Sequence, residues 1–531
     1  MKKDNIIRPK PVLLCILDGW GIAPEYSGNA VSNAQLPAFK DFINKYPIAA
    51  LSASGEAAGV PWGDMGNSKV GHINLGSGRI IYQDLPRINK SISDNSFFQN
   101  QAFTGALDHV KKFKSNLHLM GLLSNGGVHA AIEHLMSLLI LASQNEIKKV
   151  FIHLFLDGRD MSYKSAQKLV GDLQKTIEQV KVGQIATMSG RFYAMDRDNN
   201  WDRIQKAYQA IAIGEAEKIF ATPDEAFDYY YGKDVYDEEF TPTVIATGQK
   251  IESVVQDNDA IIYFNFRADR AREMTKVFAV PSFDKFDRRK EFKNLFFVTM
   301  TEYEKNLPVE VAFKPEKIIN TLGEVIAKNN LRQLRIAETE KYAHVTYFFN
   351  GGVENPYANE DRIVIPSPRV ESYADQPKMS APEVTERLIK EIDKNIYDFI
   401  LINYANADMV GHTGNMDAAV AALEYLDTAL KELAKVVLEK NGVMIITADH
   451  GNVEEMFDMQ TGSINKEHST NPVPFLIIGK DYEGKKIDAT DISGFDLSIL
   501  HPQGILADVA PTILKIMGLQ QPPEMTGRSL I

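Results

Sequence analysis

Three apolar runs in this 531-residue sequence each lead to an aspartate, and histidines follow two of the three aspartates. A single aspartate after a strand is usually a helix N-cap or a turn residue. Three such endings, accompanied by histidines, instead indicate a cation site, because open parallel sheets bind ligands outside the carboxyl ends of their strands. The runs and their aspartates are Val12–Leu17 with Asp18, Phe399–Asn403 with Asp408, and Val443–Thr447 with Asp449.

The histidines extend this donor set. Asp408 and His412 are four residues apart, a spacing that can put both side chains on one face of a helical turn. Oxygen and nitrogen donors suit Mn²⁺ or Zn²⁺, and the soft ligands of copper or iron–sulfur sites are missing. Six donors and a nucleophile are enough for two metal ions, which together stabilise the attacking and leaving oxygens of phosphoryl transfer. The six donors are Asp18, Asp408, His412, Asp449, His450 and His468.

Ser68 is the candidate nucleophile, in the glycine-rich stretch Gly63–His72. The alternative is a flexible loop in which Ser68 only caps a helix. A serine at a helix start is well placed to carry phosphate, because the helix N-terminus favours negative charge. Its hydroxyl is a weak nucleophile near neutral pH, and no Gly-x-Ser-x-Gly pattern surrounds it. A metal ion is therefore the better candidate activator.

Arginines follow four strand-like runs in the middle of the chain. One arginine alone is usually part of a surface ion pair. Several arginines at strand ends of an acidic protein indicate a cationic pocket, because guanidinium groups bind phosphate and carboxylate bidentately. The runs Leu117–Leu123, Val150–Leu156, Ile185–Met188 and Ala260–Phe266 lead in turn to His129, to Arg159 and Asp160, to Arg191, Arg197 and Arg203, and to Arg267 and Arg270.

Short apolar runs that alternate with amphipathic segments predict parallel strands joined by crossover helices, so the fold class is α/β. The length predicts two or three domains. Two charged, proline-containing stretches, 82–89 and 301–315, have the composition of crossings between domains. We therefore predict two domains, a doubly wound sheet built from residues 1–85 and 311–531 and a second α/β domain of residues 86–310 inserted into it.

Composition excludes several classes of protein. A formal net charge of −12 argues against general nucleic-acid binding, which needs a basic face. The single cysteine, Cys15, can form neither a disulfide within the chain nor a thiolate zinc site, and such usage fits the cytoplasm. No uncharged apolar stretch approaches 18 residues, so no membrane span is expected.

Motifs along nearly the full length, in the family's order, make the sequence similar to cofactor-independent phosphoglycerate mutase of the alkaline-phosphatase superfamily. One departure is Lys69, where the family often has Glu; it lies beside the nucleophile and removes no ligand. The segments are Leu17–Gly21, Met65–Ser68, Val70–His72, Phe155–Asp160, Ser189–Asp198, Asn265–Arg270, Glu340–Thr346, Asn350–Gly352, Asn403–Gly414 and Ala448–Asn452.

The resemblance implies interconversion of 3-phosphoglycerate and 2-phosphoglycerate in glycolysis and gluconeogenesis, through a phosphoserine on Ser68. It implies two divalent metals, with Mn²⁺ expected, and no 2,3-bisphosphoglycerate. One metal would be held by Asp408, His412 and His468, and the other by Asp18, Ser68, Asp449 and His450. Substrate would be bound by His129, Arg159, Asp160, Arg191, Arg197, Arg267, Arg270 and Lys341.

Asp160 or His129 is expected to help deprotonate the second hydroxyl of glycerate, and the inserted domain would be the transferase domain that binds substrate. We expect a cytoplasmic monomer that acts on a small molecule, with neither nucleic acid nor a membrane as partner. Another metal-dependent phosphomutase or phosphatase of the superfamily is the alternative function. A non-catalytic binding protein on the same scaffold is a third reading, against which the intact Ser68 and six donors argue.

Overall fold

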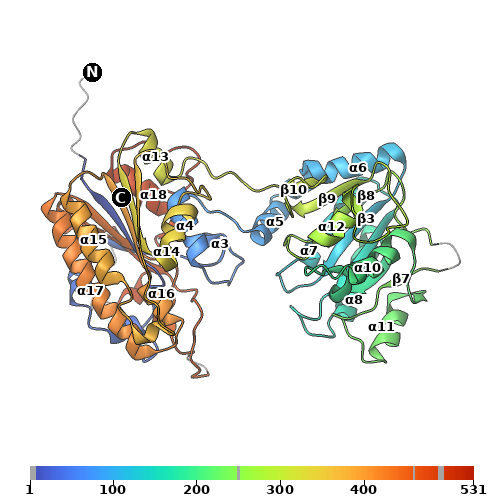
Figure 1. Cartoon of the computed structure of the whole chain (residues 1–531), viewed down its shortest axis with the longest axis horizontal. Coiled ribbons are helices and arrows are strands. Elements are labelled where there is room, and N and C mark those ends of the chain that lie inside the picture. Colours follow the sequence, from blue (N-terminus) through green and yellow to red (C-terminus); the bar gives the residue numbers. More distant parts are fainter. Residues whose placement is uncertain (1–7, 248–250, 459–460, 488–495) are drawn as a thin grey trace, which may run out of the picture. The chain divides into compact units, whose positions relative to one another are not determined.

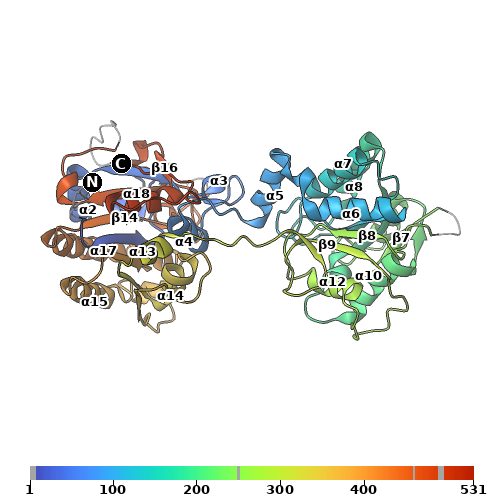
Figure 2. The same ribbon diagram turned by 90° about the horizontal axis from the view of Figure 1, so that it is seen from above.

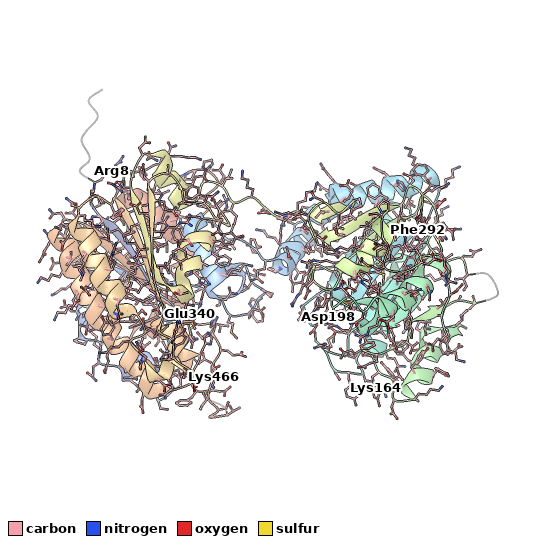
Figure 3. All side chains as sticks on the ribbon, viewed as in Figure 1. Arg8, Lys164, Asp198, Phe292, Glu340 and Lys466 are labelled. Carbon is pink, nitrogen blue, oxygen red and sulfur yellow. The ribbon has the colours of Figure 1, made fainter. Side chains whose placement is uncertain are left out.

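The computed structural model describes residues 8–247, 251–458, 461–487 and 496–531 of the chain (Figure 1). It forms two compact units. Unit 1 comprises Met1–Gln83 and Lys317–Ile531, and unit 2 comprises Asp84–Glu316. Each unit has its own hydrophobic core, and side chains fill the space between each sheet and its helices (Figure 3).

Unit 1 is built on an eight-stranded sheet of order β12-β11-β13-β1-β14-β15-β2-β16. Its pairings are parallel except those of β15, which runs antiparallel to both neighbours. The central strands β1, β13 and β14 are buried at every residue, as expected for parallel strands covered on both faces. The strands are β1 Val12–Leu17, β2 Ile48–Ser52, β11 Gln333–Glu338, β12 Glu360–Ile365, β13 Phe399–Tyr404, β14 Val443–Thr447, β15 Val473–Ile478 and β16 Gly504–Ile505.

Two layers of helices cover this sheet. On one face α17 packs against α15 and α2, and on the other α4 packs against α13 and α18 (Figures 1 and 2). The helices are α1 Ala30–Asn33, α2 Pro37–Lys45, α3 Gly55–Ala58, α4 Ser68–Ser77, α13 Leu322–Lys328, α14 Thr339–Ala343, α15 Ala381–Asp393, α16 Asn406–Gly411, α17 Met416–Glu439 and α18 Val509–Ile516, with a π-helix at His344–Phe348.

Unit 2 has a second eight-stranded sheet, of order β10-β9-β8-β3-β4-β5-β7-β6, in which only the β5–β7 pairing is antiparallel. Its strands are β3 Leu117–Leu123, β4 Val150–Leu156, β5 Gln184–Gly190, β6 Ile219–Phe220, β7 Thr243–Ile245, β8 Ala260–Tyr263, β9 Phe296–Thr301 and β10 Glu310–Phe313. Its helices are α5 Asp84–Ser93, α6 Gln101–Phe113, α7 Ile132–Gln144, α8 Ala166–Val180, α9 Arg191–Ala194, α10 Trp201–Ile213, α11 Pro223–Tyr231 and α12 Arg272–Ala279.

The α/β class predicted from the sequence is confirmed, but the two stretches interpreted as crossings contain regular structure. Residues 84–89 of stretch 82–89 belong to α5. Pro86 is compatible with this helix because it lies in the first turn, where a missing N–H breaks no helical hydrogen bond. Stretch 301–315 contains β10, which pairs with β9 in the sheet of unit 2. The division between the units therefore falls after Gln83 and after Glu316, whereas the sequence placed it after residues 85 and 310.

The strand predicted at Ala260–Phe266 is shorter in the structure. β8 ends at Tyr263, and beyond this point the hydroxyl of Tyr303 contacts the carbonyl oxygens of Tyr263 and Asn265. Phe266 N then donates to His129 O at 2.8 Å, which turns the chain toward the loop after β3. Within the described residues no helix is both long and apolar enough to cross a membrane.

The buried His134 of α7 gives unit 2 an acid-sensitive point. Its Nε2 donates to Asn89 Oδ1 at 2.9 Å, while its buried Nδ1 has no partner among the described residues. Burial lowers the pKa of His134 from 6.5 to about 4. The unfolded chain therefore takes up this proton more readily than the folded chain, and acid favours unfolding between about pH 6.5 and 4.

We predict that acidification from pH 7.5 to 5.5 lowers the temperature of thermal unfolding less in His134→Gln than in wild type. Glutamine keeps a donor for Asn89 but cannot be protonated in this range. His501→Gln removes an exposed histidine and serves as the control, which should behave like wild type. Equal losses on acidification in wild type and His134→Gln would contradict the prediction.

Candidate functional site

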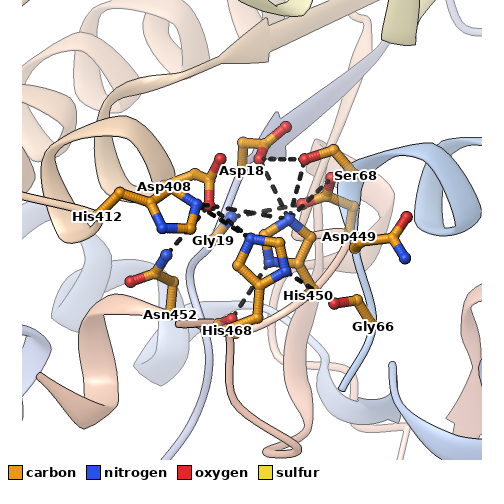
Figure 4. A network of polar contacts seen from close by, with 12 residues as sticks. Asp18, Gly19, Gly66, Ser68, Asp408, His412, Asp449, His450, Asn452 and His468 are labelled. Carbon is orange, nitrogen blue, oxygen red and sulfur yellow. Dashed lines mark hydrogen bonds and ion pairs between the residues drawn. The ribbon is translucent and has the colours of Figure 1, made fainter. Parts of the chain in front are cut away.

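Four neighbouring strands of unit 1 end at one edge of the sheet and deliver the polar side chains of the candidate site (Figure 4). β11 runs into α14, which carries Lys341, and β13 leads into α16, which carries Asp408. Asp18 directly follows β1, and Asp449 lies two residues beyond β14. The parallel order β11-β13-β1-β14 thus brings together residues from positions 18 to 449.

Asp408, His412 and His468 form the first cluster, which we call the Asp408 group. Asp408 Oδ1 lies 3.1 Å from His412 Nε2 and 3.2 Å from His468 Nε2. His412 Nδ1 contacts the carbonyl oxygen of Lys466 at 2.6 Å, and His468 Nδ1 contacts that of Gly66 at 2.8 Å. Because a carbonyl only accepts, each Nδ1 carries a hydrogen, which directs Nε2 toward the cluster and leaves it as the atom that would bind a metal.

Asp18, Asp449 and His450 form the second cluster, the Asp18 group, and all three are completely buried. Ser68 Oγ lies 3.1 Å from Asp18 Oδ1 and 3.0 Å from His450 Nε2. His450 Nδ1 lies 3.2 Å from the carbonyl oxygen of Gly451, which again directs Nε2 inward. Asp449 Oδ2 is buried and makes no hydrogen bond among the described residues, although His72 Nδ1 lies 3.1 Å away, so a cation could bind this oxygen.

Ser68 is the first residue of α4, and Asn67 before it is the N-cap whose side chain accepts from Val70 N at 3.0 Å. The alternative interpretation of Ser68 as the capping residue is therefore wrong. The Asn67 cap leaves the Ser68 hydroxyl free to face Asp18. Gly71 lets this helix approach the site, since a Cβ there would lie 2.6 Å from Asp449 Cβ.

Lys341 lies between the two cation groups. Its Nζ is 2.7 Å from Asp18 Oδ1, 2.6 Å from Asp408 Oδ2 and 2.8 Å from Ser68 Oγ. Burial opposes its positive charge, but Asp18, Asp408 and Asp449 outweigh burial and raise the pKa of Lys341. The sequence assigned Lys341 to the substrate-binding set; the structure places it among the cation donors, in contact with the candidate nucleophile.

The pKa values of Asp18, Asp408 and His450 are set by the same competition between burial and neighbouring charges. Burial disfavours ionised Asp18 and Asp408, yet Lys341 outweighs burial and keeps the pKa of both carboxyls low. Burial also works against protonated His450, but Asp449 and the other carboxylates raise its pKa to about 10. A carboxylate-rich, oxygen- and nitrogen-lined cluster with one unpartnered buried oxygen fits divalent cations, which would displace the proton of His450 on binding.

A second set of predicted residues lies together in unit 2, at the carboxyl ends of β3, β4 and β5. Arg191 Nη1 contacts Asp157 Oδ1 at 2.6 Å and Asp160 Oδ2 at 2.5 Å. His129 Nε2 lies 3.9 Å from Asp160 Oδ2. Burial first, and then Arg191, lower the pKa of His129 to about 4, so its ring is neutral near pH 7.

The remaining arginines of this set are more open. Arg197 Nη1 lies 3.0 Å from Asp269 Oδ2, and Arg267 Nε lies 3.0 Å from Asp269 Oδ1. Arg270 Nη1 donates to the carbonyl oxygen of Met195 at 3.1 Å. Arg159 is exposed and lies 3.3 Å from Glu238. Arg203 differs from these arginines, because it pairs with Asp196 and lies over the ring of Phe192.

Sequence reasoning gave no role to several buried residues that contact the two cation groups. Asn403 Nδ2 donates to Asp18 Oδ2 at 2.7 Å, and Asn452 Nδ2 donates to Asp408 Oδ1 at 3.1 Å. His72 Nδ1 lies 3.1 Å from Asp449 Oδ2. All three residues lie within the family motif segments. This location was the only sign in the sequence of a role at the site, because a buried amide or imidazole has no spacing pattern of its own.

The chain matches the Metalloenzyme superfamily over residues 10–521. The 2,3-bisphosphoglycerate-independent phosphoglycerate mutase of Clostridium perfringens (strain SM101 / Type A) is 51% identical over 523 residues, 98% of this chain and 99% of that protein. The protein of the same name from Clostridium novyi (strain NT) is 51% identical over 522 residues, with the same coverage. A solved structure of Leishmania mexicana phosphoglycerate mutase at low cobalt concentration is 29% identical, with a TM-score of 0.54, and covers 99% of this chain and 98% of its own.

We predict that Mn²⁺ raises the thermal unfolding temperature of chelator-treated protein, since a ligand of the folded state stabilises it by mass action. The gain should shrink as pH falls, because the cation competes with the proton of His450. Asp408→Asn should reduce the gain. Asp427→Asn, which alters a buried carboxylate that caps α2 in the same unit, should retain it. A wild-type protein unaffected by Mn²⁺ and Zn²⁺ would contradict the assignment.

Proposed function

This chain belongs to the 2,3-bisphosphoglycerate-independent phosphoglycerate mutases of the Metalloenzyme superfamily, and on that premise we propose which residues carry out its reaction. The enzyme is an isomerase that interconverts 3-phosphoglycerate and 2-phosphoglycerate in glycolysis and gluconeogenesis, through a phosphoserine intermediate. One observation carries the assignment of residues: Ser68 Oγ contacts Asp18, His450 and Lys341 within 3.1 Å.

We propose that Asp408, His412 and His468 hold one divalent cation and that Asp18, Asp449, His450 and Ser68 hold a second. Mn²⁺ is the metal we expect at both positions, because the donors are carboxylate and imidazole. When bound, such cations lower the pKa of a coordinated hydroxyl and stabilise the charge on the oxygens of a transferring phosphoryl group.

In the proposed first step, Ser68 Oγ attacks phosphorus, and the bond from phosphorus to the 3-oxygen of glycerate breaks as the bond to serine forms. Lys341 Nζ, 2.8 Å from Ser68 Oγ, stabilises negative charge that develops at the serine and on the phosphoryl oxygens. In the second step the 2-oxygen of glycerate attacks phosphoserine and frees Ser68. The two hydroxyls thus exchange one phosphoryl group, and no second phosphate donor is needed.

Protons move with the phosphoryl group: in the first step Ser68 loses one and the 3-oxygen gains one, and in the second the 2-oxygen loses one and Ser68 regains one. We assign acceptance of the proton from the 2-hydroxyl to His129 or Asp160. The depressed pKa of His129 keeps its imidazole neutral, and its buried Nδ1 has no hydrogen-bond partner among the described residues. Arg191 Nη1 contacts Asp160 Oδ2 at 2.5 Å and so fixes the position of this carboxylate. His129 and Asp160 are therefore the two candidate acceptors of this proton.

We assign recognition of the glycerate carboxylate and hydroxyls to unit 2, through His129, Arg159, Asp160, Arg191, Arg197, Arg267 and Arg270. On this assignment unit 2, residues 84–316, is the transferase unit, and unit 1 is the metal-binding phosphatase-like unit. We further propose that the enzyme works as a monomer in the cytoplasm on this small molecule, with no nucleic-acid or membrane partner. A phosphatase would share the Ser68 chemistry, but it would not need a unit that retains the alcohol product.

Ser68→Ala tests the phosphate carrier. The assay is conversion of 3-phosphoglycerate by purified protein with added Mn²⁺ and without 2,3-bisphosphoglycerate. Removing the nucleophile should lower the rate by several orders of magnitude, as for other nucleophile deletions. Thermal unfolding of the variant should stay close to that of wild type. Near-normal turnover by pure Ser68→Ala would rule out a phosphoserine on this residue.

A double variant, Arg267→Ala/Arg270→Ala, separates a mutase from a phosphatase. Without these guanidinium groups glycerate should escape more often, so that water takes the phosphoryl group from Ser68. We expect a higher ratio of inorganic phosphate to isomerised product from labelled 3-phosphoglycerate, even as total activity falls. Arg203→Ala, which removes an arginine already paired with Asp196, is the control. An unchanged ratio at unchanged substrate affinity would show that these arginines do not retain the intermediate.

A further inference from the structure

His72 and Asn403 link the helix of the nucleophile to Asp18 through a buried chain of polar contacts. His72 is completely buried in α4, and Asn403, in β13, is 1% exposed. Neither residue takes part in the reaction proposed above, and neither is one of the six cation donors. Their shared position, directly behind Asp18 and Ser68, requires a separate explanation.

The direction of each hydrogen bond in this chain follows from the chemistry of its ends. His72 Nδ1 lies 2.8 Å from the carbonyl oxygen of Ser68, which only accepts, so Nδ1 carries the hydrogen. Nε2 then accepts a hydrogen of Asn403 Nδ2 at 3.0 Å. The same amide nitrogen donates its second hydrogen to Asp18 Oδ2 at 2.7 Å. The ionised carboxylate cannot donate, which fixes the orientation of the amide.

The two oxygens of Asp18 consequently have different surroundings. Oδ2 is tied to Asn403, whereas Oδ1 lies 3.1 Å from Ser68 Oγ, 2.7 Å from Lys341 Nζ and 3.4 Å from His450 Nε2. Rotation of the carboxylate would break the bond to Asn403. The chain of contacts therefore holds Oδ1 toward the nucleophile and the other cation donors.

Two further features indicate that this arrangement serves the site more than the stability of the fold. Asn403 Oδ1 is buried without a hydrogen-bond partner among the described residues, a condition that disfavours folding. His72 Nδ1 also lies 3.1 Å from Asp449 Oδ2, the oxygen that keeps no hydrogen-bond partner of its own. The imidazole therefore borders one donor of the Asp18 group, Asp449, as well as the main chain of Ser68.

We propose that His72 and Asn403 are positioning residues that orient Asp18 for the second cation and for Ser68. The Asp408 group does not depend on them, because its carboxylate receives its amide hydrogen bond from Asn452 instead. This inference rests on the proposed function, since it assumes that each group holds a cation. It assigns to the pair a specific effect on one cation of the two.

The test measures Mn²⁺ binding to chelator-treated full-length protein by calorimetric titration, together with kcat and KM. Wild type should bind two ions. In His72→Leu and Asn403→Leu one ion should bind about 10- to 100-fold more weakly, the usual effect of losing a group that orients a metal ligand, while the other is unchanged. Anomalous scattering from Mn²⁺-soaked crystals should place the retained ion at the Asp408 group. We expect kcat to fall while KM changes little.

Conservative and control variants keep the result interpretable. In His72→Gln an amide can still meet Asn403, so its affinity should lie between those of wild type and His72→Leu. Asp427→Asn perturbs a buried carboxylate elsewhere in unit 1 and should bind both ions as wild type does. If His72→Leu does not fold, Asn403→Leu and His72→Gln decide the question. Unchanged binding of both ions in these variants would overturn the inference, and a wild type that binds no metal would instead overturn the proposed function.

Discussion

Unit 1 depends on the burial of three carboxylates at one edge of its sheet. Asp18 and Asp449 are fully buried and Asp408 is 2% exposed, so little water screens their mutual repulsion. Lys341, delivered by the neighbouring strand β11, contacts two of the three and supplies the permanent positive charge of the cluster. Protonated His450 supplies another. Three carboxylates can be buried together here because the strand order places these two positive groups within contact distance of them.

Much of the site could be predicted from the sequence because its ligands follow strands whose apolar runs are unmistakable. Asp18, Asp408 and Asp449 each follow an apolar run, so their positions can be read from the neighbouring sequence. The four-residue spacing of His412 from Asp408 is a local pattern as well. The contact of His72 with Asn403 joins residues 331 positions apart, so no local pattern could reveal it. The position of Lys341 likewise depends on β11 lying beside β13, which is a property of strand order rather than of spacing.

The fold shows the same division between local and non-local information. The apolar runs at Val12–Leu17, Val150–Leu156 and Val443–Thr447 coincide with strands, because continuous apolar stretches are what doubly covered parallel strands need. The unit boundaries lie within 82–89 and directly after 301–315, as charge and proline indicated, but these features concealed α5 and β10. Pro86 is harmless in the first turn of a helix, and β10 is a partly exposed edge strand. Edge strands need little hydrophobic pattern and are correspondingly hard to see.

Asp269 gives the arginines of unit 2 a resident counter-ion, with Arg197 and Arg267 each about 3.0 Å from one of its oxygens. On the substrate-binding role proposed for these arginines, an incoming carboxylate would displace Asp269 from the guanidinium groups. The net free energy of binding the carboxylate would then be the difference between an arginine–Asp269 pair and an arginine–carboxylate pair. Because the two pairs are chemically similar, this difference would be small. Under that proposal, weak net binding of the carboxylate would favour release of either isomer.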